Sequence, residues 1–223
     1  MDTRPRTPRV FALAGALEPA WLLVAAAAFG TLRSGYDATH AISELGEQGY
    51  ALALVWNVVG FGVAALLHLV FALAIRDAVG GGWLFRVAVL QALLLGASGM
   101  FGCDPGCPPL MTSWQGWAHT VVGLGYFLLT WVVPLVGWRT FRARPEWRSF
   151  APISLGAAAI LVGLFVAGPI LFGPELVGVW QRLTLAVAGA WTTVVAVRLW
   201  RRASPAAAIG QRPTDRTREP AGS

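Results

Sequence analysis

Six long apolar segments, separated by short polar stretches, make up most of the 223 residues of the chain. About 20 consecutive apolar residues in a helix are enough to cross the hydrocarbon core of a membrane, and each segment reaches about that length. The pattern predicts transmembrane helices at residues 10–32, 50–75, 83–101, 117–138, 152–172 and 178–199. The expected fold class is an all-α integral membrane protein, a bundle of six transmembrane helices.

The same pattern divides the chain into three parts. Residues 1–9 form a basic N-terminal segment, residues 10–200 hold the transmembrane domain, and residues 201–223 are rich in Pro, Ala, Arg, Thr and Ser. A tail of that composition cannot bury a hydrophobic core, so we expect it to be disordered.

The charges are sorted by loop, and this orients the bundle. The chain contains no lysine, and only two of its 17 arginines, Arg33 and Arg182, lie at the end opposite to the termini. The acidic residues concentrate at that end, at Asp37, Glu44, Glu47, Asp104 and Glu175. Because basic residues gather on the cytoplasmic side, we expect both termini to be cytoplasmic and the longer loops, 33–48 and 102–115, to face outward. We expect a multi-pass protein of the cell membrane, with membrane lipids as partners.

The net charge of +6 raises the question of nucleic-acid binding. The arginines lie in short loops next to apolar segments and in the tail, where attraction to anionic lipid head groups accounts for them. We therefore expect no nucleic-acid partner. The first segment resembles a secretory signal in its basic start and its alanine run near Ala25, but its length of about 23 residues favours an uncleaved helix.

Two cysteines in the second long loop form the motif Cys103-Asp-Pro-Gly-Cys107. Asp-Pro-Gly favours a turn, which brings the two thiols close together. Outside the cytoplasm such a pair usually oxidises, so a small structural disulfide is the main interpretation. Two free or redox-active thiols and a metal site with Asp104 are the alternatives, although two cysteines four residues apart are a weak metal signal.

Polar side chains gather near the outward end of the expected bundle. They are Asp37, His40, Ser43 and Glu44 in the first loop, Asn57 in the second segment, His119 in the fourth, and Gln181 and Arg182 in the sixth. One interpretation is structural: these groups cap helices and tie loops together, as Ser43 and Glu44 would at a short interfacial helix from about Ala41. The other is a polar pocket in which His119 is a ligand or base and Arg182 holds an anionic group. A charge one turn into a helix also predicts an acidic partner for Arg182, from Asp104, Glu44 or Glu175.

A deeper polar group consists of Glu18, His68 and Gln91. Each lies about eight residues from the cytoplasmic end of its segment, which places all three about 12 Å into the bilayer at 1.5 Å per residue. Glu18 and His68 form either one satisfied interhelical contact or part of a proton relay, as such pairs do in transporters.

Several of these residues carry a resemblance to a known family. Ile42-Ser-Glu-Leu-Gly46, Asn57 with Gly60, Phe101-Gly-Cys-Asp-Pro-Gly-Cys-Pro108, His119 and Gln181-Arg182 make the chain similar to the bacterial and archaeal membrane family catalogued as domain of unknown function 998. The resemblance covers nearly the whole membrane portion. It implies a six-helix membrane domain and no stated activity, and it implies that one set of positions forms a site: Ser43, Glu44, Asn57, Asp104, His119 and Arg182.

A looser resemblance is to membrane hydrolases of the alkaline ceramidase type, where histidines, an aspartate and a serine surround a zinc ion within seven helices. The chain has three histidines, and His68 lies in the opposite leaflet from His40 and His119, so a three-histidine zinc site is not expected. A zinc site from His40, Asp104 and His119, with Ser43 nearby, is the remaining metal alternative.

Three functions are compatible with these features. The first, which we favour, is binding or transport of a small amphiphile or lipid through a polar pocket at the extracytoplasmic face. The second is an outward-facing membrane hydrolase that acts on a lipid, with or without a metal. The third is a structural partner without a site. The sequence identifies no metal, no cofactor and no oligomeric state.

Overall fold

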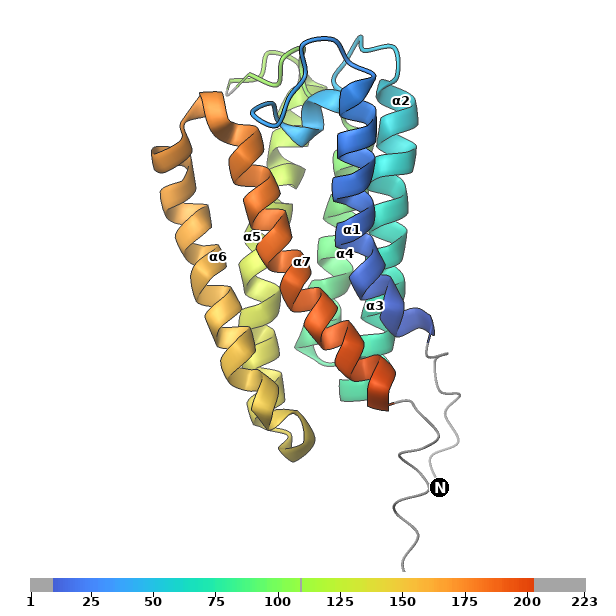
Figure 1. The fold of residues 1–223 in the computed structure, drawn as a ribbon, viewed down its shortest axis with the longest axis vertical. Helices are drawn as coiled ribbons and strands as arrows, with labels where there is room; N and C mark the ends of the chain where they lie inside the picture. Colours follow the sequence, from blue (N-terminus) through green and yellow to red (C-terminus); the bar gives the residue numbers. More distant parts are fainter. Residues whose placement is uncertain (1–9, 109, 203–223) are drawn as a thin grey trace, which may run out of the picture.

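The computed structural model describes residues 10–108 and 110–202, and this part of the chain is helical apart from its connections (Figure 1). In chain order the elements are α1 (Val10–Thr31), η1 (Ile42–Gly46), α2 (Ala53–Trp56), η2 (Asn57–Gly62), α3 (Val63–Val79), α4 (Trp83–Met100), α5 (Trp114–Arg142), η3 (Pro145–Phe150), α6 (Ala151–Phe172), η4 (Pro174–Leu176) and α7 (Val177–Arg202). The expected all-α fold is confirmed. The expected basic segment 1–9 and the tail from residue 203 onward lie outside the described residues.

The described chain contains six helices that are long and apolar enough to span a membrane, as the sequence predicts. Elements α2, η2 and α3 follow one another without a break and form one of the six, Ala53–Val79. Helix α1 begins and α7 ends at the same end of the bundle (Figure 1), which we call the arginine-rich end. The opposite end holds the two long connections, and we call it the loop end.

Helix α5 extends at both ends beyond the apolar segment that predicts it. Helix α5 begins at Trp114 rather than 117, because the hydroxyl of Ser113 accepts the N–H of Gly116 at 3.0 Å and caps the helix. It ends at Arg142 rather than 138, where the guanidinium lies 4.7 Å from the ring centroid of Trp138. Long side chains of this kind let a helix continue past the apolar region, because they carry their charge back to water.

The second spanning helix contains a π-helical turn, η2. At its end the N–H of Val63 donates to the carbonyl of Val58, five residues earlier. Within the turn, the carbonyl of Val59 accepts the indole N–H of Trp21 in α1 at 2.7 Å. The turn holds one more residue than an α-helical turn and therefore changes which face of the helix points inward.

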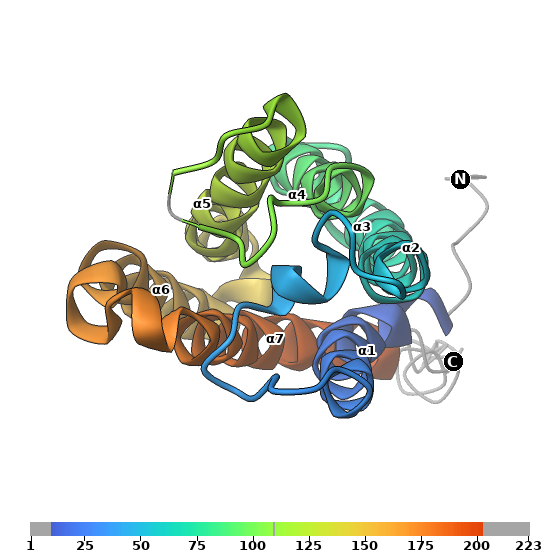
Figure 2. The same cartoon turned by 90° about the horizontal axis from the view of Figure 1, so that it is seen from above.

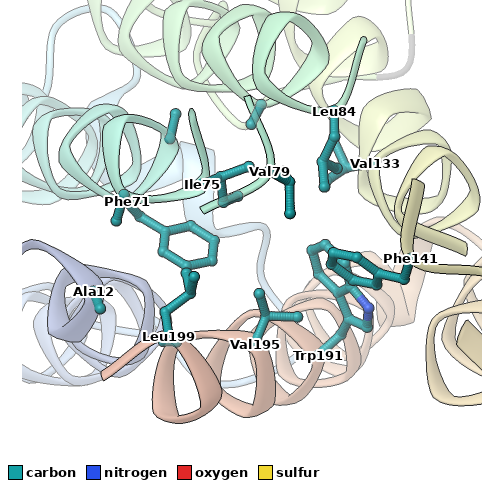
Figure 3. Packing of buried hydrophobic residues seen from close by; sticks show 14 of the residues in the cluster. Ala12, Phe71, Ile75, Val79, Leu84, Val133, Phe141, Trp191, Val195 and Leu199 are labelled. Atoms are coloured by element: carbon teal, nitrogen blue, oxygen red, sulfur yellow. The ribbon is translucent and has the colours of Figure 1, made fainter. Parts of the chain in front are cut away.

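Two clusters of buried apolar residues fill the bundle. The cluster nearer to the arginine-rich end packs large side chains from α3, α5 and α7 against one another (Figure 3), among them Phe71, Phe141 and Trp191. The second cluster lies nearer to the loop end and includes Leu22, Trp56, Phe61 and Leu95. Between the two clusters along α1, α3 and α4 come the polar residues Glu18, His68 and Gln91, none more than 4% exposed.

The connection between α1 and α2 turns back into the bundle. Figure 2 looks along the bundle and shows η1 inside the ring of helices. Ile42 and Leu45 of η1 are 3% and 0% exposed, and Glu44 is buried beside them. The short helix expected near Ala41 is therefore present, but it is buried rather than interfacial. We call residues 33–48 the plug.

Gly178 of α7 lies directly against the plug. Its N–H donates to the carbonyl of Thr39 at 2.8 Å, and a Cβ added to it would overlap the carbonyls of Ala38 and His40. We expect Gly178→Ala to lower the free energy of unfolding by about 1–3 kcal/mol, the usual cost of overpacking. Thermal unfolding of the purified protein in detergent measures this change.

Gly156→Ala is the matched control, because an added Cβ at this position in α6 meets nothing within 4 Å. It should keep or raise the melting temperature, since alanine favours a helix over glycine. Equal melting temperatures for the two variants would contradict the close contact between α7 and the plug.

Candidate functional site

Arg182 fixes the plug to α7. One guanidinium nitrogen donates to the carbonyls of Ala38 and His40 at 3.0 and 2.9 Å, and also to the carbonyl of Gly178. The other donates to the hydroxyl of Tyr36 at 2.9 Å. The prediction of an acidic partner for Arg182 is wrong. Within the described residues Arg182 makes no ion pair, and hydrogen bonds to carbonyl oxygens stabilise its charge. The guanidinium thereby supplies donors to backbone carbonyls of the plug and of α7.

Three more side chains pair the backbone of the plug. The carboxylate of Glu44 accepts the N–H of Ala41 at 2.9 Å, and the amide oxygen of Gln181 accepts the N–H of Ile42 at 2.8 Å. The amide nitrogen of Asn57 donates to the carbonyl of Gly46 at 3.4 Å. Glu44 and Asn57 therefore hold η1 in place, which favours the structural interpretation of these two positions.

Arg33, the other arginine of the loop end, performs a similar task. It donates to the carbonyl of Glu44, and its guanidinium pairs with the carboxylate of Glu47 at 2.7 Å. The second carboxylate oxygen of Glu47 accepts the N–H of Gly106 at 2.6 Å. The plug is thereby tied to the loop that carries the two cysteines.

Cys103 and Cys107 form a disulfide, as the main interpretation of their motif predicts. The N–H of Cys107 donates to the carbonyl of Asp104 at 2.8 Å, which closes the Asp-Pro-Gly turn between the cysteines. Each sulfur lies 3.6 Å from an oxygen of Ser43, Cys103 from the carbonyl and Cys107 from the hydroxyl. The disulfide therefore packs on the plug.

Asp104 organises the second loop. Its carboxylate accepts the hydroxyl and N–H of Ser113, the hydroxyl and N–H of Thr112, and the amide of Gln48. Hydrogen bonds from Ser113 and Thr112 hold the pKa of this carboxyl below its ordinary value of 3.8. Its oxygens are engaged within the loop and with the plug.

His119 lies at the wall of a cavity. Its Nδ1 is 2.7 Å from the carbonyl of Phe101 and 3.2 Å from that of Ser98. Because both neighbours are acceptors, Nδ1 carries the proton in the neutral ring, and Nε2 is left with its lone pair. Nε2 makes no hydrogen bond to the described part of the chain.

The cavity has a volume of about 270 Å³ and lies under the plug. Its walls come from α1, η1, η2, α4, α5 and α7 and from the disulfide loop. Most of the lining is apolar, including Leu22, Phe61, Leu95, Phe127 and Trp180. The polar lining consists of Ser43, Ser98, His119, Thr120, Tyr126 and Gln181. A mainly apolar cavity with a few directed polar groups is typical of a small-molecule site.

His119 and Gln181 give the cavity one acceptor and one donor. The amide oxygen of Gln181 already accepts the N–H of Ile42, so its NH₂ group remains to donate. Both side chains are uncharged in this arrangement. The cavity can therefore recognise a neutral group that both donates and accepts, such as a hydroxyl.

The expected site residues divide into three sets. Ser43 and His119 line the cavity, whereas Glu44, Asn57, Asp104 and Arg182 fix the loops above and beside it. His40 does not line the cavity: its ring contacts Asp37, with Nδ1 and the carboxylate oxygen 3.2 Å apart.

Asp104 and His119 do not contact each other, because each forms hydrogen bonds with different partners. Among the described residues no group of three His, Cys, Asp or Glu could hold a metal ion, so the alternative of a zinc site from His40, Asp104 and His119 is not assembled.

Tyr126, Phe127 and Trp180 line the cavity without having been expected there. They lie within long apolar segments, where aromatic residues usually belong to the core. The indole N–H of Trp180 donates to the carbonyl of Leu164 at 2.7 Å, and its ring packs on Phe127 with centroids 4.9 Å apart. Only the packing of α5 against α7 shows that these rings surround a cavity.

Comparison with protein families gives one match, to the family described as protein of unknown function (DUF998), over residues 16–198. The chain belongs to this DUF998 family. The expected resemblance is confirmed, and the match spans all six helices. Neither curated proteins nor solved structures gave a match. The family assigns no activity, so the function must come from the site.

The low pKa of Asp104 predicts a pH dependence of stability. A carboxyl whose pKa is lower in the folded chain stabilises the fold above its unfolded pKa, and this contribution disappears as the pH falls through the folded value. We expect Asp104→Asn to be less stable than the wild type at neutral pH, and the difference to shrink as the pH falls below 3.8. Thermal unfolding over this range measures both.

Glu175→Gln is the control, because Glu175 is exposed in η4. Its melting temperature should follow that of the wild type at every pH. A constant difference between Asp104→Asn and wild type on acidification would show that the carboxylate charge does not stabilise the loop.

Proposed function

We propose that the protein binds a small amphiphile, a molecule with an apolar chain and an uncharged hydroxyl head, in the cavity under the plug. The observation that carries this proposal is the pairing of a largely apolar cavity with the free lone pair of His119 and the free NH₂ group of Gln181. The apolar walls favour the chain, because its burial removes hydrocarbon from water. The acceptor and the donor favour the head.

The volume limits the size of the ligand. About 270 Å³ is slightly below the range of about 300–1,000 Å³ that is usual for drug-sized ligands. A single short chain, or one segment of a longer lipid, fits this limit better than a whole phospholipid. In the described part of the chain no arginine lines the cavity, and Arg182 is engaged by the plug, so a neutral head is favoured over an anionic one.

The sorting of charges supports an extracytoplasmic position for this cavity. Among the described residues, Arg33 and Arg182 are the only arginines of the loop end, and the positive-inside rule favours an outward position for this end. Both arginines are held by the plug, which gives them a structural reason to break the rule. The cell membrane is the corresponding location.

A second cavity supports entry from the lipid side. It has a volume of about 300 Å³, lies where α6 passes through η4 into α7, and is lined mainly by apolar residues. Val177 and Trp180 line both cavities. We call the cavity under the plug the main cavity. An amphiphile that arrives between α6 and α7 would therefore meet the ring of Trp180 before it enters the main cavity.

The alternative of a lipid hydrolase has less support. It would combine His119 with Asp104, but Asp104 does not line the cavity and its carboxylate is engaged by Ser113, Thr112 and Gln48. Binding requires only groups that already face the cavity.

Filling the cavity should abolish binding. Gly123 lines the cavity, and an added Cβ there meets nothing within 4 Å, so Gly123→Phe places a ring in the space without a backbone clash. We expect this variant to reduce labelling by a ten-carbon alcohol with a mid-chain diazirine at least fivefold. The measurement is photolabelling of the full chain in lipid nanodiscs, with the labelled peptides mapped by mass spectrometry.

Gly163→Phe is the matched control, because Gly163 lies on an exposed face of α6 and its added Cβ also meets nothing within 4 Å. It should label like the wild type, on peptides of α5 and α7 that line the cavity. Equal labelling of both variants, or labels spread evenly over the lipid-facing helices, would contradict the proposed site.

The hydroxyl head should contribute to the affinity independently of the apolar chain. The same diazirine chain with a methyl end instead of the hydroxyl leaves the hydrogen-bonding groups of His119 and Gln181 unpaired, which costs about 1 kcal/mol or about fivefold in affinity. We expect about fivefold weaker competition against the labelled alcohol. Equal competition by the two compounds would show that the apolar walls alone select the ligand.

A further inference from the structure

Beneath the main cavity lies a smaller one that the proposed binding site does not use. Its volume is about 20 Å³, which is enough for one water molecule. Its polar lining comes from all five surrounding helices: Glu18 of α1, His68 of α3, Gln91 of α4, Tyr126 of α5 and Thr192 of α7. We call it the inner chamber.

The inner chamber contains an acid and a base in mutual reach. The carboxylate oxygen Oε2 of Glu18 lies 3.6 Å from Nδ1 of His68, and the two side chains are 6% and 3% exposed. Neither ring nitrogen of His68 has a hydrogen-bond partner among the described residues. A buried imidazole with both nitrogens unpaired is costly, so His68 needs a polar partner, such as a water molecule in the inner chamber.

The inner chamber and the main cavity share a wall. Leu22, Tyr126 and Leu185 line both. A ligand in the main cavity therefore rests on the residues that cover Glu18 and His68.

We propose that Glu18 and His68, together with one water molecule in the inner chamber, form a proton-binding site whose occupancy controls binding in the main cavity. The proton lies either on the carboxyl, as Oε2–H facing Nδ1, or on the imidazole, as Nδ1–H facing the carboxylate. In both forms the pair has no net charge. Release of the proton through the chamber water to bulk solvent leaves a carboxylate and a neutral imidazole, with a net charge of −1.

The charge balance of the surroundings decides the direction of control. The titratable groups that line the chamber are Glu18, His68 and Tyr126, while Gln91 and Thr192 are uncharged. Among the residues that the structure describes, no arginine lines the chamber. The negative charge left by proton release therefore has no cationic partner in the chamber. An apolar ligand excludes water from the shared wall and raises the cost of that charge, so it favours the protonated pair. Ligand binding and proton binding then strengthen each other.

The proton site itself is tested without any ligand. Infrared spectra of the full chain in lipid nanodiscs, recorded from pH 9 to pH 5, should show a carboxylic acid C=O band that grows on acidification in the wild type and is missing in Glu18→Gln. His68→Gln, which removes the base, should shift the pH at which the band appears. A wild type minus Glu18→Gln difference that is the same at every pH would overturn the proton site.

The coupling between ligand binding and proton binding rests on the proposed function. It is tested with the diazirine alcohol. We expect photolabelling of the wild type to fall at least threefold between pH 6 and pH 9, and labelling of Glu18→Gln to be independent of pH. Glu175→Gln, which removes an exposed carboxylate, should retain the fall. Labelling of the wild type that does not change with pH would overturn the coupling. A wild type that is not labelled in the main cavity at any pH would overturn the proposed function, while the infrared result would still decide the proton site.

Discussion

Residues 41–47 of the plug are largely buried inside a ring of apolar helices, and this burial is the constraint on which the loop end depends. Buried N–H and C=O groups must be paired, because each unpaired group costs as much as a lost hydrogen bond. The carbonyls of residues 38–41, 44 and 46 accept from Arg182, Gly178, Tyr36, Arg33 and Asn57. Side chains from α7 and from the second spanning helix thus form hydrogen bonds with one short loop.

The need to pair the backbone of the plug also explains the sequence features through which this chain resembles the DUF998 family. The Ile-Ser-Glu-Leu-Gly string is the buried helix η1, and Asn57, Gln181 and Arg182 are its anchors. The cysteine motif supplies the disulfide that lies against Ser43. These positions form one assembly: Glu44, Asn57, Asp104 and Arg182 hold the loops in place, while Ile42, Ser43, Cys107, Pro108, His119 and Gln181 line the cavity.

The number and approximate bounds of the spanning helices follow from hydropathy, because a bilayer-length apolar run has few other folded solutions. The shared depth of Glu18, His68 and Gln91 also follows from helix rise alone, and the inner chamber contains all three. The partners of Arg182 could not be predicted, since sequence reasoning pairs charges with side chains and does not locate free carbonyls. The roles of Tyr126 and Trp180 depended on helix packing, which composition does not encode.

The π-helical turn η2 has a consequence for the depth and direction of the groups along the second spanning helix. Trp56 precedes the turn and is fully buried against the plug side, while His68 follows it and faces the inner chamber. An α-helix advances by about 100° per residue, so the extra residue rotates everything after the turn by about that angle relative to everything before it. Loss of one residue between 57 and 62 would therefore turn either the indole or the imidazole toward lipid. The inserted residue lets one helix bury the indole of Trp56 on one face and direct the imidazole of His68 to the inner chamber on another.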